Sequence, residues 1–152
     1  MKKLMAICLI FAIVMLFAAC NAEQPLEETV DGTQDTVEVG TGKWAEAKYL
    51  SDTEIGMGSK TVIVTVKAEE KEISFIVHSD KTYLGDALLE NGLIEGEQGA
   101  YGLYIKKVNG ILADYDIDKT YWGFYKSGEM MMVGVSAAEF VSGDCYELVL
   151  ES

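Results

Sequence analysis

The sequence predicts an α+β domain over residues 60–152, because strand and helix patterns both occur there in a definite order. Two runs rich in β-branched residues come first, and one segment with helical spacing follows them. Further runs rich in aromatic and aliphatic residues complete the chain. The order of a hairpin, one helix and then more strands is that of a β-grasp. We therefore expect a β-grasp-like fold in which a single helix packs on one face of a mixed sheet.

Two neighbouring segments predict a β-hairpin at the start of this domain. Thr61–Val66 is β-branched at every position, which favours extended backbone. A short polar turn, Ala68–Lys71, leads to Ile73–His78, where apolar and aromatic residues are again enriched. We therefore expect two adjacent strands that pair with each other.

One segment carries the signals of a helix with a defined start and end. Thr82 is a candidate N-cap, and Asp86 would lie near the positive end of the helix dipole. Apolar residues between 84 and 88 keep helical spacing. Gly92 can adopt the left-handed conformation that ends many helices, and Leu93 can fold back on the last turn.

More strands are expected after the helix, bounded by turn residues. Gly102–Val108 leads into Asn109–Gly110, a dipeptide typical of two-residue hairpin turns. The aromatic strand Tyr121–Tyr125 ends at Ser127–Gly128, and Cys145–Leu150 forms the last strand.

The N-terminus has the pattern of a secretory signal that ends in a cysteine. Lys2 and Lys3 precede an apolar run, Leu4–Ala19, whose last residues are small, and Cys20 follows. The pattern resembles the lipobox of bacterial lipoproteins, although Phe17 stands where leucine is usual. The alternative is an uncleaved membrane anchor, but the run of 16 residues is shorter than the 18 or more of a spanning helix. We expect residues 1–19 to be removed, Cys20 to be lipidated, and the protein to be anchored at the extracellular face of the cell membrane.

Two segments separate the lipid anchor from the domain. Residues 20–43 are acidic, with sparse and aperiodic apolar residues, so we expect a disordered tether. Residues 44–59 are ambiguous: Trp44 and other apolar side chains could pack on the domain, but Gly56 and Gly58 interrupt any regular element.

Charge and cysteine content exclude several classes of function. The formal net charge is −13, which makes nucleic acid a poor partner. Cys8 leaves with the signal and Cys20 is expected to carry lipid, so no internal disulfide is expected. The remaining cysteine, Cys145, is interpreted as a buried structural thiol.

Little in the sequence predicts catalysis or a metal site. His78 is the single histidine, and no nucleophile elbow, phosphate loop or metal-ligand pair accompanies it. Asp114–Asp118 has the oxygen spacing that begins a calcium loop, but Lys119 and Tyr125 occupy the positions of its glycine and its bidentate glutamate. We therefore expect no enzyme, no metal and no required cofactor, and a solvated acidic loop at this place.

An aromatic strand and a methionine run are the strongest candidates for a binding surface. Alternation places Trp122 and Phe124 on one face of their strand and Tyr121, Gly123 and Tyr125 on the other. Three consecutive methionines, 130–132, cannot all point into a core in extended chain, so at least one must face outward. Pattern alone leaves open whether the aromatic residues form a surface or fill the core.

The same residues resemble a known family, the C-terminal domain of transcobalamin and intrinsic factor, which bacterial surface proteins share as a module of otherwise unknown function. The resemblance covers roughly residues 52–152. It rests on four segments, Gly102–Ile111, Lys119–Phe124, Ser127–Gly128 and Gly134–Val135.

The resemblance implies a β-grasp-like domain that lies over one face of a corrin ring. It implies that Ile105, Phe124, Met131 and Tyr101 contact the ligand, and Trp122 joins them from the strand pattern. In the vitamin carriers a helical barrel covers the other face of the corrin ring, and this barrel is absent here. We therefore expect cobalamin or another corrinoid to bind weakly or together with an uptake-system protein. The alternative is a protein-interaction or structural module of the cell envelope without a small-molecule ligand.

Overall fold

The computed structural model describes residues 39–152, which form part of one compact unit. The predicted signal peptide, Cys20 and most of the predicted tether lie outside the described residues. Within them, no helix is long and apolar enough to cross a membrane. The elements in chain order are η1 (Gly42–Glu46, a 3₁₀-helix), β1 (Thr53–Gly56), β2 (Lys60–Ala68), β3 (Lys71–Ser79), α1 (Leu84–Glu90), β4 (Ile94–Gly99), β5 (Gly102–Val108), β6 (Ile111–Leu112), α2 (Tyr115–Asp118), β7 (Tyr121–Lys126), β8 (Glu129–Met130) and β9 (Cys145–Glu151).

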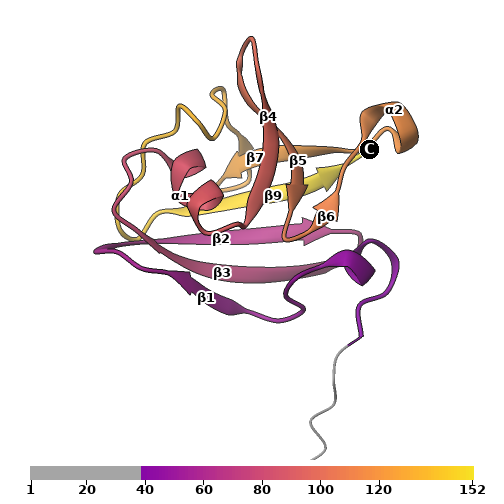
Figure 1. The fold of residues 1–152 in the computed structure, drawn as a ribbon, viewed down its shortest axis with the longest axis horizontal. Coiled ribbons are helices and arrows are strands. Elements are labelled where there is room, and N and C mark those ends of the chain that lie inside the picture. The colour runs from indigo at the N-terminus through magenta and orange to yellow at the C-terminus, as the bar shows by residue number, and fades with distance from the viewer. Residues whose placement is uncertain (1–38) are drawn as a thin grey trace, which may run out of the picture. The chain divides into compact units, whose positions relative to one another are not determined.

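The strands form two sheets, and helix α1 lies against them on one side (Figure 1). The larger sheet is mixed and six-stranded, in the order β1-β3-β2-β9-β7-β8. In it β2 and β3 are the predicted hairpin, while β1 runs parallel to β3 and β9 runs parallel to β2. The smaller sheet, β4-β5-β6, is antiparallel and was not predicted as a separate sheet. The mixed sheet with few helical residues is thus confirmed.

The core lies between the large sheet and the layer formed by α1 and the small sheet. Alternate residues of β2 and β3 face it, so Val64 and Phe75 are fully buried while their neighbours reach the other face. Tyr146 and Leu148 of β9 continue this buried face. Cys145 lies on the opposite face and is exposed. Its expected burial was wrong, because Cys145 shares its side of the strand with Glu147 rather than with Leu148.

Helix α1 ends as predicted but begins differently. Gly92 has φ +62°, and the N–H of Leu93 donates to the carbonyl of Leu88 at 2.9 Å, which closes the last turn. The predicted N-cap, Thr82, is wrong, since Tyr83 occupies that position without a side-chain hydrogen bond. The first helical N–H groups instead donate to carbonyls of a distant loop, Leu84 to Ala138 and Gly85 to Val135, both at 2.8 Å.

The ambiguous lead-in, residues 44–59, packs on the domain. Trp44 is buried, and its indole N–H donates to the Ala68 carbonyl at 2.9 Å. The Asn109 side chain bonds both backbone groups of Tyr49, at 3.0 and 2.8 Å, in the manner of a strand partner. Together with β1, these bonds attach the segment to both sheets.

Candidate ligand-binding site

The methionine run follows directly from strand β7 through a tight turn. Ser127 and Gly128 both have positive φ, 54° and 78°, as a two-residue type I′ turn requires. Met130 then ends the short strand β8. Its side chain is 56% exposed, that of Met132 is 96% exposed, and Met131 is partly buried against the core. The prediction that at least one methionine faces outward is confirmed.

The exposed segment is fixed at both of its ends. The N–H of Met131 donates to the Phe124 carbonyl at 2.9 Å. On the far side Val135 is buried, and its carbonyl accepts the hydrogen bond from Gly85 of helix α1. Between these points, a Cβ atom built on Gly134 would meet no described atom within 4 Å. The segment is therefore a short exposed arch held between two buried supports.

A groove of about 490 Å³ lies along this arch. Its charged residues are Lys126 and Glu129, and Lys126 donates to the Asp144 carboxylate at 2.8 Å. This hydrogen bond, together with one to the Tyr146 hydroxyl, raises the pKa of Lys126. The groove is lined by Lys126, Ser127, Glu129, Met130, Met131, Met132 and Val133. Its surface is thus mainly thioether and aliphatic, and its one lysine is already paired.

The tip of the β4–β5 hairpin projects beyond the rest of the small sheet (Figure 1). Tyr101 stands fully exposed at this tip. The hairpin is joined to the loop that follows the methionines, because the N–H of Leu103 donates to Ser136 Oγ at 3.2 Å. This hydrogen bond joins strand β5 of the hairpin to the loop just beyond the methionine arch.

Three residues predicted to contact a ligand lie in the core. Ile105, Trp122 and Phe124 are each at most 8% exposed. Phe124 stacks on Tyr146, with ring centroids 5.4 Å apart. Phe124 therefore does not lie on an open surface, contrary to the ligand contact that the resemblance implies: it takes the inner face of β7, opposite Leu148 of β9. Within residues 39–152, Trp122 Nε1 is a buried donor without a hydrogen-bond partner.

Of the predicted contacts, Met131 and Tyr101 thus remain accessible, Met131 in part. Met130 and Met132 belong to the predicted methionine surface, but only Met131 was predicted as an individual ligand contact, and Val133 was not predicted. Residues 130–133 form the accessible part of the candidate site, Met131 only in part, and Ile105, Trp122 and Phe124 belong to the core.

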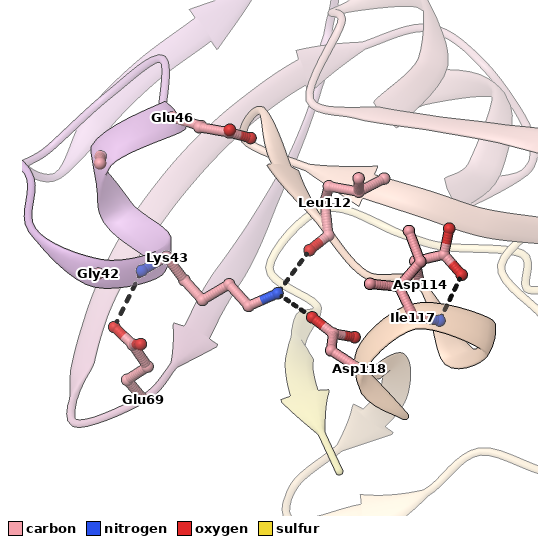
Figure 2. Close-up of a pocket in the computed structure, with 9 residues that line it drawn as sticks. Gly42, Lys43, Glu46, Glu69, Leu112, Asp114, Ile117 and Asp118 are labelled. Carbon is pink, nitrogen blue, oxygen red and sulfur yellow. Dashed lines mark hydrogen bonds and ion pairs between the residues drawn. The ribbon is translucent and has the colours of Figure 1, made fainter.

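A second pocket, of about 430 Å³, lies between η1 and α2 (Figure 2). Lys43 crosses it and donates to Asp118 Oδ2 at 2.5 Å and to the Leu112 carbonyl at 3.3 Å. Asp114 caps α2 by accepting from two backbone N–H groups, and Asp118 also accepts from Thr120. The Lys43 hydrogen bond, followed by those from Thr120, holds the pKa of Asp118 well below its usual range. The predicted acidic loop is thus a short capped helix in which the carboxylates of Asp114 and Asp118 bond within the chain.

The single histidine, His78, contacts side chains of two neighbouring strands. His78 Nε2 lies 2.5 Å from a Glu54 carboxylate oxygen, and Nδ1 lies 3.3 Å from Thr61 Oγ1. No group of three or more histidine, cysteine, aspartate or glutamate side chains in the part of the chain that the structure describes could hold a metal ion.

Comparisons with known proteins define the family. A family model described as "Domain of unknown function (DUF4430)" matches residues 81–147. A crystal structure of a Ruminococcus gnavus ATCC 29149 protein, described provisionally as metal binding, is 34% identical with a TM-score of 0.58, and covers 62% of this chain and 98% of that protein. The chain belongs to the family of this Ruminococcus gnavus protein.

A second solved structure is more distant. Haptocorrin in complex with Cbi is 21% identical with a TM-score of 0.48, and the match covers 64% of this chain and 26% of haptocorrin. No curated protein matches the sequence.

Proposed function

We propose that this protein is a lipid-anchored module at the extracellular face of the cell membrane that binds a ligand with a flat apolar face, with cobalamin or another corrinoid as the ligand. The observation that carries the proposal is the methionine arch. Met130, Met132 and Val133 expose apolar side chains along one groove, and contiguous exposed apolar surface is typical of an interaction site.

The chemistry of methionine suits such a ligand. Its unbranched side chain has three rotatable bonds and a polarizable sulfur, so neighbouring methionines adapt to a flat surface without a change of backbone. Met131 and Tyr101 are the positions that the family resemblance relates to corrin contacts. Met131 lies in this arch and is partly accessible, and Tyr101 is exposed at the tip of the hairpin that bonds to the loop beyond the arch. Ile105, Trp122 and Phe124 act in this proposal as a rigid base beneath the site.

The expected affinity is low when the module acts alone. Covering one face of a corrin buries on the order of 250 Å² of apolar surface, worth about 6 kcal/mol at roughly 25 cal/mol per Å². Association costs at least about 4 kcal/mol, which leaves about 2 kcal/mol, weaker than millimolar binding. An uptake-system protein that covers the other face of the ligand would supply the missing contacts.

Methyl NMR tests the proposal, because it detects weak binding. The full chain labelled with ¹³C at the methionine methyl groups is titrated with cobinamide and with cobalamin. We expect the signals of Met130, Met131 and Met132 to shift, while that of Met57, a methionine 90% exposed elsewhere, stays in place. Equal shifts at Met57, or no shift with either probe at about 10 mM, where a dissociation constant of tens of millimolar still leaves a detectable bound fraction, would reject corrinoid binding at the arch.

The lipid anchor needs a separate test, since Cys20 lies outside the described residues. Cys20→Ala should abolish metabolic labelling of the protein with a fatty acid, because the thiol is the expected acceptor. Unchanged labelling of this variant would contradict lipidation while leaving the binding proposal intact.

A further inference from the structure

The same three methionines supply a ligand chemistry that apolar binding does not use. Thioether sulfur is a soft donor, and soft sulfur ligands select Cu(I) over hard divalent cations. Within residues 39–152, no group of three or more histidine, cysteine, aspartate or glutamate side chains could hold a metal ion. We propose that Met130, Met131 and Met132 form a Cu(I) site.

The geometry allows the three sulfurs to meet at one ion. The α-carbons of Met130 and Met132 are two residues apart and so at most about 7 Å from each other. All three residues line the same groove, although Met131 is also partly buried against the core. Each has three rotatable bonds, so the sulfur atoms can converge while the backbone stays in place. The backbone itself is held by the bond from Met131 to Phe124 on one side and by buried Val135 on the other.

The charged side chains that line the groove are compatible with a bound monovalent cation. The ammonium of Lys126 is paired with Asp144 at 2.8 Å, so its charge is compensated, and Glu129 adds a carboxylate to the lining. Thioethers bind no proton in the physiological range. Cu(I) affinity at this site is therefore expected to stay nearly constant under mild acid, in contrast to sites built from thiolate or imidazole, which must lose protons to bind.

Methionine-to-leucine substitution separates this site from the apolar-ligand site. Leucine has a similar volume and remains apolar, so it preserves packing and an apolar surface. It lacks sulfur, so it removes metal coordination while the surface of the groove stays apolar. The Cu(I) site does not depend on corrinoid binding, and the two proposals can fail separately.

The test uses the full chain with Cys8→Ser, Cys20→Ser and Cys145→Ser, because thiols would themselves bind Cu(I). Ascorbate keeps the copper reduced without oxygen, and bicinchoninate competes for it. We expect this protein to withdraw Cu(I) from bicinchoninate, and to do so equally at about pH 7 and about pH 5.5. The variant M130L/M131L/M132L should lose this capacity, and Met57→Leu should keep it.

Several results would overturn the site. These are failure of the methionine-containing protein to take up Cu(I), retention of Cu(I) by the triple leucine variant, and equal loss in Met57→Leu. The double variant M130L/M132L, which leaves the partly buried Met131 in place, guards against misfolding of the triple variant and should also bind Cu(I) more weakly. Unchanged Cu(I) uptake by a folded double variant would count against the site.

Discussion

Two apolar segments that are only a few residues apart along the chain differ strongly in their exposure to solvent. Trp122 and Phe124 of β7 are each 8% exposed, whereas Met130 and Met132 are 56% and 96% exposed. Their composition alone does not distinguish them. The difference shows that the position of a strand within the sheets decides which apolar residues are free to bind a ligand.

Neighbouring strands explain the difference. Strand β7 pairs with β9 on one side and with β8 on the other, and its inner face packs toward β5. Strand β8 is two residues long and lies at the end of the sheet order, so the chain beyond Met130 has no further strand to pair with. Apolar side chains in that position remain outside unless they turn back toward the core, as Met131 does in part.

Truncation of Phe124 tests the buried half of this comparison and should have the largest effect. Phe124→Ala removes a ring that stacks on Tyr146, so we expect a loss of about 3–5 kcal/mol in the free energy of unfolding. Urea unfolding followed by tryptophan fluorescence measures it. A loss below about 1 kcal/mol, the size usual for an average substitution, would mean that Phe124 is not a core residue.

Local sequence signals predicted the parts of the fold that depend on neighbours in the chain. The β2–β3 hairpin, the end of α1 at Gly92, and the turns at Asn109–Gly110 and Ser127–Gly128 all follow from residues a few positions apart. The start of α1 was missed because its acceptors, the carbonyls of Val135 and Ala138, come from about fifty residues downstream.

The candidate site, too, could be predicted only where neighbouring residues in the chain determine it. The methionine run could be recognised as exposed, because three adjacent residues cannot all point inward. Which face of β7 is covered could not be read from its alternation, since the cover is β5, a strand of a second sheet that forms with β4 and β6. The sequence alone therefore could not show that Phe124 is buried.

Ser136 tests how the hairpin tip is joined to the loop beyond the methionines. Ser136→Ala removes the acceptor of the Leu103 N–H, and a lost hydrogen bond of this kind costs about 1 kcal/mol. Ser142→Ala is a matched control, because Ser142 Oγ accepts from the Thr61 N–H at the other end of the same loop. We expect similar losses of stability in urea, but altered methionine methyl signals only in Ser136→Ala. Identical spectra for the two variants would show that the Ser136 bond does not influence the arch.

Substitution of Asp118 tests the contact between η1 and α2, where an ion pair rather than apolar packing joins the two elements. The pKa of Asp118 is lowered by Lys43 and Thr120, so its contribution to stability is present above its unfolded pKa and is lost as the pH falls below it. Asp118→Asn should therefore be less stable than the unchanged protein at neutral pH. The difference should shrink below about pH 4, near the ordinary pKa of aspartate. A pH-independent difference in thermal midpoint would show that charge is not the cause.

Truncation of Met132 tests the exposed half of the comparison and should have the smallest effect on stability. Its side chain is 96% exposed, so Met132→Ala should change the free energy of unfolding by no more than about 0.5 kcal/mol. Met57→Ala, at 90% exposure, is expected to behave alike in urea. The two variants should differ only with added probe, since Met132 lines the groove and Met57 does not. A large loss of stability in Met132→Ala would mean that the arch folds onto the domain in solution, and the contrast with β7 would then disappear.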